Sequence, residues 1–155
     1  MNGYRIEKIR CRVIVRTHSG ETITGEIFLQ PFARPGGENE RPQDILNNTD
    51  PFFPVALADG DTLLVAKEQV LELSMDRDDD EEPDAIDALA RPMVVEIRLV
   101  SGEKHAGAIF LEMPTERPRL LDFLNRDSER FLTLHGTERR FLINRRGIEH
   151  VRPLD

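Results

Sequence analysis

The sequence contains one internal repeat, and this feature limits the fold more than any other. The segment 13–21 matches the segment 95–103, and both end in Ser-Gly-Glu. Self-similarity of this kind is the sequence signature of a duplicated structural unit. Because two copies share 155 residues, each unit has to be a very small domain.

Three further pairs of segments match in the same order along the chain. They are 25–29 with 107–111, 44–47 with 122–125, and 63–73 with 141–151. The two copies differ in length mainly because the first has a longer loop, residues 31–42, which is rich in proline and glycine. Loops tolerate such length changes better than the elements they connect. We therefore interpret residues 1–73 as the first unit, 74–92 as an acidic linker and 93–155 as the second unit.

The apolar pattern of each copy predicts a series of short strands. Residues 9–16 and 95–99 alternate between apolar and charged side chains, which is typical of a half-buried strand. Gly25 and Gly107 interrupt the second strand and predict a sharp bend or bulge there. A short helical segment ends near Asn125 in the second copy. Later strands are expected at 52–57, 62–66 and 70–73, and at 131–134, 140–143 and 148–151, with a one-turn connection before the last of each set.

Bent strands of this kind can close a small barrel. The sequence therefore predicts a mainly β protein made of two tandem small β-barrels of the SH3-like or Sm-like type, each with one short helix.

The second copy carries residues that resemble the two motifs of Sm-like barrels. The first motif is matched by Gly102, Gly107, Asp122 and Asn125, and the second by Arg145-Arg146-Gly147. The resemblance implies that Asp122, Asn125 and Arg145 form a pocket for an RNA base. The first copy has Ala66-Lys67-Glu68 where the second has Asn144-Arg145-Arg146, so the implied RNA site belongs to the second copy.

Two pairs of polar residues are shared by both copies: Asp44 with Asn47, and Asp122 with Asn125. One interpretation is a ligand pocket that is used twice. The other is structural, because Asp and Asn side chains satisfy free backbone groups at the ends of a short helix. The spacing of three residues at helix ends favours the structural interpretation.

The densest basic cluster consists of Arg139, Arg140, Arg145 and Arg146. Guanidinium groups on either side of one short strand are suited to an acidic protein partner or to phosphates. The alternative is a solvated face with local ion pairs, each of which contributes little to stability.

The net charge of −8 is concentrated in the linker, because residues 74–90 contain eight acidic side chains and one arginine. Such a run is expected to be disordered. A sharper hypothesis is that the acidic run folds back onto the arginine cluster and competes with an acidic ligand. A whole-molecule nucleic-acid binder would be basic, which this chain is not.

Several function classes lack their sequence signatures here. There is no serine in a glycine elbow and no glycine-rich phosphate loop. The four histidines show no metal-ligand spacing, and the only cysteine, Cys11, cannot form an intrachain disulfide. No apolar stretch is long enough to cross a bilayer. We therefore expect no enzyme, metal site or cofactor, no membrane association, and a cytoplasmic location.

The sequence thus favours a non-catalytic protein-interaction or adaptor module in a bacterial cytoplasm. A protein partner would dock on a barrel rim or a sheet edge, and the arginines of the second copy would steer it. Homo-oligomers are compatible with this interpretation, because an open sheet edge can pair with another strand. The alternative is Sm-like RNA or nucleotide binding through the second copy.

Overall fold

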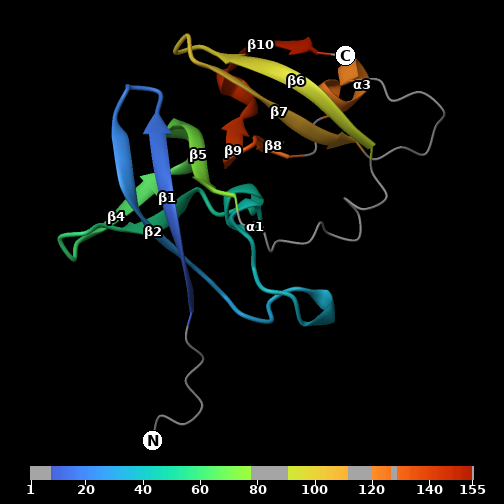
Figure 1. Ribbon diagram of the computed structural model, residues 1–155. Helices are drawn as coiled ribbons and strands as arrows, with labels where there is room; N and C mark the ends of the chain where they lie inside the picture. The colour runs from blue at the N-terminus through green and yellow to red at the C-terminus, as the bar shows by residue number, and fades with distance from the viewer. Residues whose placement is uncertain (1–7, 78–90, 112–119, 127–128, 155) are drawn as a thin grey trace, which may run out of the picture. The chain divides into compact units, whose positions relative to one another are not determined.

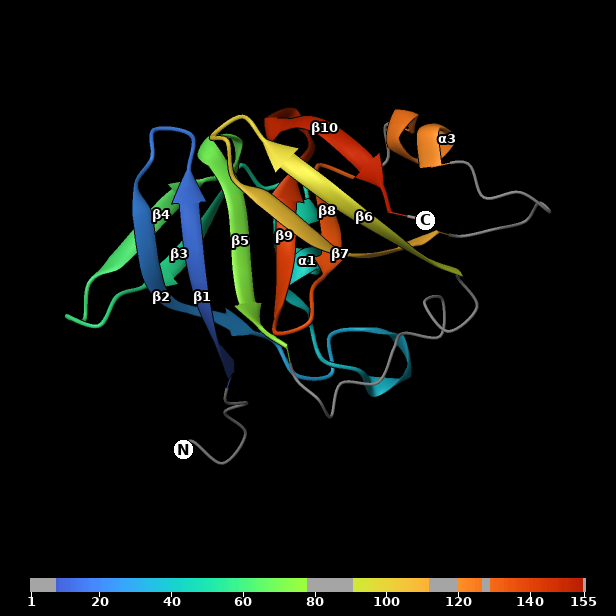
Figure 2. The same ribbon diagram turned by 45° about the horizontal axis from the view of Figure 1, so that its top comes forward.

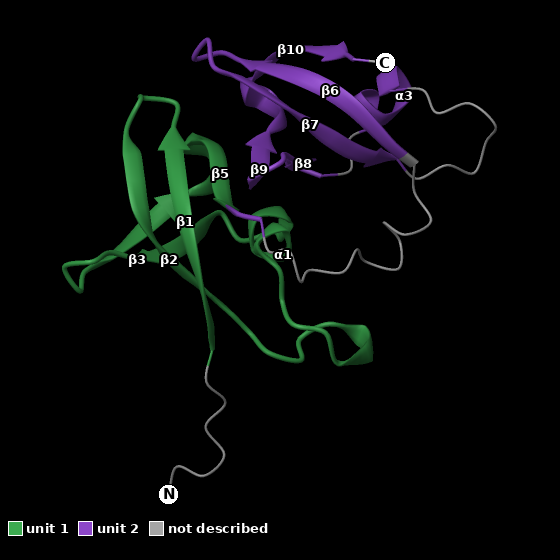
Figure 3. Ribbon diagram, viewed as in Figure 1, with its two compact units in different colours: residues 1–75 green, residues 76–155 purple. Residues whose placement is uncertain are grey.

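The computed structural model describes residues 8–77, 91–111, 120–126 and 129–154. The chain divides into two compact units, unit 1 (residues 1–75) and unit 2 (residues 76–155), which Figure 3 shows in different colours. The mainly β fold that the sequence predicts is confirmed, because the described residues form ten strands and two short α-helices. In the part of the chain that the structure describes, no helix is long and apolar enough to cross a membrane.

Unit 1 is an antiparallel sheet with the strand order β5-β1-β2-β3-β4. Strands β5, β1 and β2 lie side by side in Figures 1 and 2. A 3-10 turn, η1, lies in the long loop after β2, and a second, η2, joins β4 to β5. The elements are β1 (Ile9–Thr17), β2 (Thr22–Leu29), η1 (Pro35–Gly37), α1 (Pro42–Asn47), β3 (Phe52–Ala56), β4 (Thr62–Ala66), η2 (Lys67–Gln69) and β5 (Val70–Asp76).

Unit 2 has the corresponding antiparallel order, β10-β6-β7-β8-β9. Its fourth and fifth strands are also joined by a 3-10 turn, η3, so the predicted one-turn connection is present in both units. The elements are β6 (Arg91–Leu99), β7 (Lys104–Leu111), α3 (Leu120–Asn125), β8 (Phe131–His135), β9 (Arg139–Asn144), η3 (Arg145–Gly147) and β10 (Ile148–Pro153).

The strand register is also the same in the two units. Val13 pairs with Gly25 in unit 1, and Val95 pairs with Gly107 in unit 2. The ladder between the first and fifth strands shifts register next to Thr17 in unit 1 and next to Leu99 in unit 2. These are matching positions of the sequence repeat, so the same irregularity occurs at the same place in both sheets.

Gly25 and Gly107 are explained by a close approach of the next strand. A Cβ atom at Gly25 would clash with the carbonyl oxygen of Ala56, and one at Gly107 would lie 2.5 Å from that of His135. The second and third strands meet through one residue pair in each unit, Glu26 with Ala56 and Ala108 with His135. Glycine lets the two backbones cross at this point.

The core of each unit follows the predicted alternation along the first strand. Val13 and Val15 are fully buried in unit 1, and Val95, Ile97 and Leu99 are fully buried in unit 2. Ile9, which shares the face of Val13, is exposed, so the buried part of β1 begins further along the strand than the sequence pattern predicts. Side chains from the third and fourth strands complete each core, among them Phe53, Val55 and Val65, and Leu132, Leu134 and Ile143.

The strands extend into both ends of the predicted linker 74–92. Residues 74–76 belong to β5, and β6 begins at Arg91. Residues 78–90, including the acidic run 78–82, lie outside the described residues. Within each unit the hydrogen-bonded strand order is open, because β4 and β5, like β9 and β10, stand at opposite ends of it.

Candidate functional site

The C-terminal end of helix α1 is held by a buried lysine. The ammonium of Lys67 donates hydrogen bonds to the carbonyl oxygen of Ile45 and to Oδ1 of Asn48, each at 2.6 Å, and its side chain is fully buried. Free carbonyl groups at a helix end need such donors, and a cation there also interacts favourably with the helix dipole. Lys67 lies in η2, which brings it back to a helix more than twenty residues earlier in the chain.

Arg145 occupies the matching place in unit 2. Its Nη1 donates a 3.1 Å hydrogen bond to the carbonyl oxygen of Leu124, near the end of α3. The guanidinium carbon lies 5.4 Å from the centre of the Phe123 ring, which is within the range of a cation–π contact. Both units therefore use the first residue of the 3-10 turn to hold the end of their short helix.

Asp44 stabilises the start of α1. Its carboxylate accepts a 2.9 Å hydrogen bond from the backbone N–H of Arg41, and its own N–H donates to the carbonyl oxygen of Arg41. The guanidinium of Arg34 lies 3.6 Å from the same carboxylate. These contacts agree with the structural interpretation of Asp44. Asn47 is half-buried at the end of the helix, where its neighbour Asn48 is the residue that binds Lys67.

Asp122 and Asn125 are both exposed on α3. Asn125 is the last residue of this helix and follows Leu124, whose carbonyl oxygen binds Arg145. The structure thus brings Arg145 to the helix end that carries Asn125, while Asp122 lies in the first turn of the same helix. Two residues of the predicted RNA site, Asp122 and Asn125, lie on α3, and the third, Arg145, contacts the end of that helix from η3.

The four clustered arginines lie in different environments. Arg139 forms a 2.6 Å ion pair with Asp76, Arg140 is buried, and Arg145 holds the end of α3. Of the four, only Arg146 is exposed; its backbone N–H donates to Oδ1 of the buried Asn144. Asp76 is the last residue of β5, and the acidic run 78–82 that is predicted to fold back onto the arginines lies outside the described residues.

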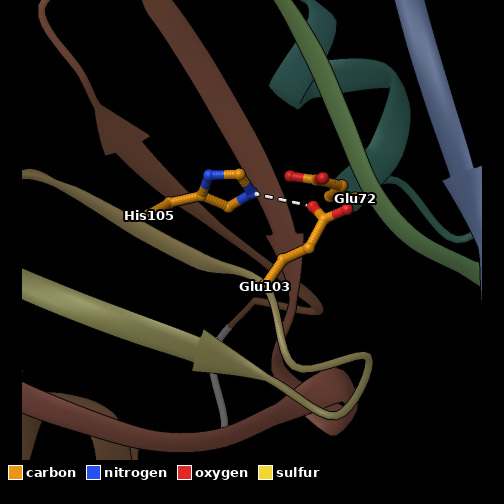
Figure 4. A group of neighbouring side chains, drawn as sticks. All are labelled: Glu72, Glu103 and His105. Atoms are coloured by element: carbon orange, nitrogen blue, oxygen red, sulfur yellow. Dashed lines mark ion pairs between the residues drawn. The ribbon is translucent and has the colours of Figure 1, made fainter.

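Two side chains of unit 2, Phe141 and Glu103, lie close to the imidazole of His105 on β7. Its ring stacks on Phe141 with a centroid distance of 4.0 Å, and its Nε2 lies 3.7 Å from Oε2 of Glu103. Figure 4 shows the imidazole directed toward that carboxylate. By itself this pair supplies two ligand atoms, whereas a protein zinc site uses three or four.

Apolar side chains cover the outward face of the β3–β4 hairpin in unit 1. Phe52 is 57% exposed and Leu64 is 72% exposed, and the exposed Pro54 pairs directly with Leu64 across the two strands. Leu63, on the other face of β4, is also partly exposed. Sequence reasoning missed this surface. Its signal was the lack of alternation in the runs Phe52-Phe53-Pro54-Val55 and Leu63-Leu64-Val65, which have apolar residues on both faces.

The long loop of unit 1 displays a further aromatic side chain. Phe32 is 73% exposed and has a backbone φ of 59°, a region that residues other than glycine rarely adopt. The base of the loop is closed by two hydrogen bonds between Gln30 and Glu40, and the N–H of Phe32 donates to Oδ1 of Asn39.

Comparisons with protein-family models, with curated proteins and with solved structures found no match to this chain.

Proposed function

We propose that this protein is a non-catalytic interaction module, an adaptor that binds a protein partner on the β3–β4 hairpin of unit 1. The observation that carries the proposal is the outward apolar face of this hairpin, with Phe52 and Leu64 more than half exposed on paired strands. Contiguous exposed apolar surface on a small domain marks an interaction site more often than scattered apolar residues do.

The edge position of β4 supports the same proposal. Among the described strands, β4 has β3 as its only hydrogen-bonded neighbour. The outer backbone groups of an edge strand can bind a further strand, and apolar side chains beside that edge can then select the partner. Backbone pairing and an apolar face therefore coincide on one short hairpin.

The arginine cluster has a smaller part in this proposal than the sequence predicts. Arg146 is the exposed member of the cluster, and we propose that it, rather than the whole set, steers an acidic partner. We propose the cytoplasm as the compartment. Disulfides are rare there, and the single cysteine of this chain cannot form an intrachain disulfide.

We also propose that the two units descend from one small SH3-like or Sm-like barrel by duplication. The shared strand order, the shared register shift, the paired glycines Gly25 and Gly107, and the basic residue at each helix end support this origin. An experimental structure in which residues 9–73 and 93–151 fail to superimpose would contradict the proposed duplication.

The test of the interaction proposal is affinity capture from the native host with the full chain as bait. Leu64→Asp places a charge on the exposed face and should release a specific protein that the unaltered chain retains. Leu121→Asp is the matched control, because Leu121 is 67% exposed on α3 in unit 2. Equal capture by all three chains would contradict the proposed site.

RNA or nucleotide binding through unit 2 is the second candidate function. It is favoured by the meeting of Arg145 and Asn125 at one helix end. Because Arg145 also holds that helix end, Asn125→Ala and Arg146→Glu are better first variants than Arg145→Glu. The candidate predicts an RNA complex whose affinity falls steeply with salt and is reduced by both variants. RNA binding that neither variant changes would argue against this site.

A further inference from the structure

We infer that the partner of the β3–β4 hairpin contributes an extended segment with an apolar centre and basic ends, which adds a strand to the free edge of β4. This inference rests on the proposed interaction function and deepens it, because it names the chemistry and the backbone conformation of the occupant. The residues that carry it belong to unit 1 alone.

Two backbone hydrogen bonds determine which groups of β4 point toward its free edge. The N–H of Leu57 donates to the carbonyl oxygen of Asp61, and the N–H of Lys67 donates to that of Pro51. In an antiparallel pair, residues that bond to the neighbouring strand alternate with residues whose backbone groups point away from it. Counted from either bond along the register of β3 and β4, three residues direct their backbone N–H and carbonyl groups away from β3: Thr62, Leu64 and Ala66.

The same three residues carry uncharged side chains on the outward face of the hairpin. Leu64 is 72% exposed and pairs with the exposed Pro54, and Ala66 pairs with Phe52, which is 57% exposed. A strand that bonds to the backbone of Leu64 places its opposing side chain on this face, because directly opposed residues lie on the same side of a sheet. Backbone bonding and apolar contact therefore involve the same alternate residues of the bound segment.

The exposed charges around the hairpin are all acidic. The structure describes every residue from 48 to 69, and the charged ones are Asp50, Asp59, Asp61, Lys67 and Glu68. Lys67 is fully buried against the end of α1, whereas the four carboxylates are exposed. Asp61 directly precedes β4, and Glu68 follows its last residue by two positions. Carboxylates near both ends of an uncharged strand favour cations at both ends of the segment that binds it.

The sign of these charges distinguishes the hairpin from the arginine cluster. Arg146 belongs to unit 2 and attracts acidic groups, whereas the hairpin of unit 1 attracts basic ones. The segment that binds β4 and the region that Arg146 attracts are therefore different parts of the partner.

The first test selects the segment without assuming its sequence. A displayed library of random nine-residue peptides is selected on the full chain, and peptides that also bind the Leu64→Asp chain are removed. The selected peptides should have apolar residues at alternate central positions, and Lys and Arg should exceed Asp and Glu at both ends. Leu121→Asp is the matched control and should retain these peptides, because Leu121 is exposed on α3 in unit 2.

Backbone N-methylation of a selected peptide tests strand addition. Each N-methyl group removes one N–H donor, and only alternate N–H groups of an added strand face β4. N-methylation should therefore abolish binding at every second residue and leave it nearly unchanged at the residues between. Fluorescence polarisation of labelled peptides against the full chain measures both effects.

A charge reversal tests the basic ends. Asp61→Lys should weaken binding of a selected peptide about two- to fivefold at low salt, because an exposed ion pair contributes little. The difference should shrink as the salt concentration rises. A peptide whose terminal cations are replaced by glutamates should bind the Asp61→Lys chain more tightly than the unaltered chain.

The inference would be overturned if the selection enriched no peptide that depends on Leu64. Selected peptides with acidic ends, or N-methylation without alternation, would also overturn it. Self-association that Leu64→Asp abolishes would identify a second copy as the occupant and contradict the inference as well. If affinity capture nevertheless identifies another protein that depends on Leu64, the proposed function stands and this inference falls.

Discussion

The hairpins β3–β4 and β8–β9 have matching register but lie in opposite environments. The strand pair opposes Phe53 to Val65 in unit 1 and Leu132 to Ile143 in unit 2, and all four side chains are buried. The outward faces differ: they are largely exposed in unit 1 and buried in unit 2.

This difference distinguishes apolar residues that are needed for packing from apolar residues whose presence on the surface has another cause. Leu142 is fully buried, so its identity is explained by packing. Leu64 stands at the matching place and is 72% exposed, so packing within the described chain does not explain why it is apolar. A contact made by another molecule would explain it, which is why the comparison points to unit 1 as the binding unit.

The most direct test of this difference is to place the same charge on both hairpins and compare the loss of stability. Leu142→Asp should lower the free energy of unfolding by about 4 kcal/mol or more, because it buries an unpaired carboxylate. Leu64→Asp should change it by less than about 0.5 kcal/mol, as exposed substitutions usually do. Urea denaturation followed by circular dichroism measures both. A similar loss in the two variants would mean that the hairpin of unit 1 is covered within the chain.

Alanine at the crossing glycines tests whether the two sheets are built alike. Gly25→Ala and Gly107→Ala should each cost about 3 kcal/mol, because the added Cβ meets a backbone carbonyl that cannot rotate away. Gly20→Ala is the control: it has no atom within 4 Å of its Cβ and a φ of 95°, so strain alone should cost about 1 kcal/mol. If the loss of stability differed between Gly25→Ala and Gly107→Ala, the strand crossing would not be equivalent in the two units. Denaturation curves of the full chain give these values.

The sequence was sufficient to predict elements whose pattern is local. The alternation in residues 95–99 and the turn at Ser-Gly-Glu determine a strand and a hairpin through nearest neighbours alone. The interior glycines were also recognised, although as bends or bulges. Their actual cause, a crossing by the third strand about thirty residues away, depends on tertiary contacts that no local pattern contains.

The candidate site was harder to predict for the same reason. The repeat singles out Asn47 because it matches Asn125, yet the hydrogen bond to Lys67 is made by Asn48. The four arginines lie within a segment of eight residues, 139–146, but the fold places Arg139, Arg140 and Arg145 in different environments. Spacing along the chain shows which charges are close in sequence, and only the fold shows which of them remain exposed.

Removal of the basic residue at each helix end sharpens the comparison of the units. Lys67→Met should destabilise the protein by about 2 kcal/mol, because two oxygen acceptors lose a buried charged donor. Arg145→Met should cost about 1 kcal/mol, since Arg145 is half-buried and makes one described hydrogen bond to the helix. Thermal and urea unfolding would rank the two variants. A larger cost at Arg145 would show that unit 2 depends more strongly on this contact.

The smallest expected difference concerns the two helix carboxylates. Asp44→Ala should cost about 1 kcal/mol, because the Arg41 N–H loses its acceptor at the start of α1. Asp122→Ala should cost about 0.5 kcal/mol or less, since Asp122 is exposed and lies in the first turn of α3, where a carboxylate interacts favourably with the helix dipole. The ordering separates a structural carboxylate from one that remains accessible to a ligand. If Asp122→Ala were the more destabilising variant, Asp122 would have a structural role, and the RNA site proposed for unit 2 would lose one of its three residues.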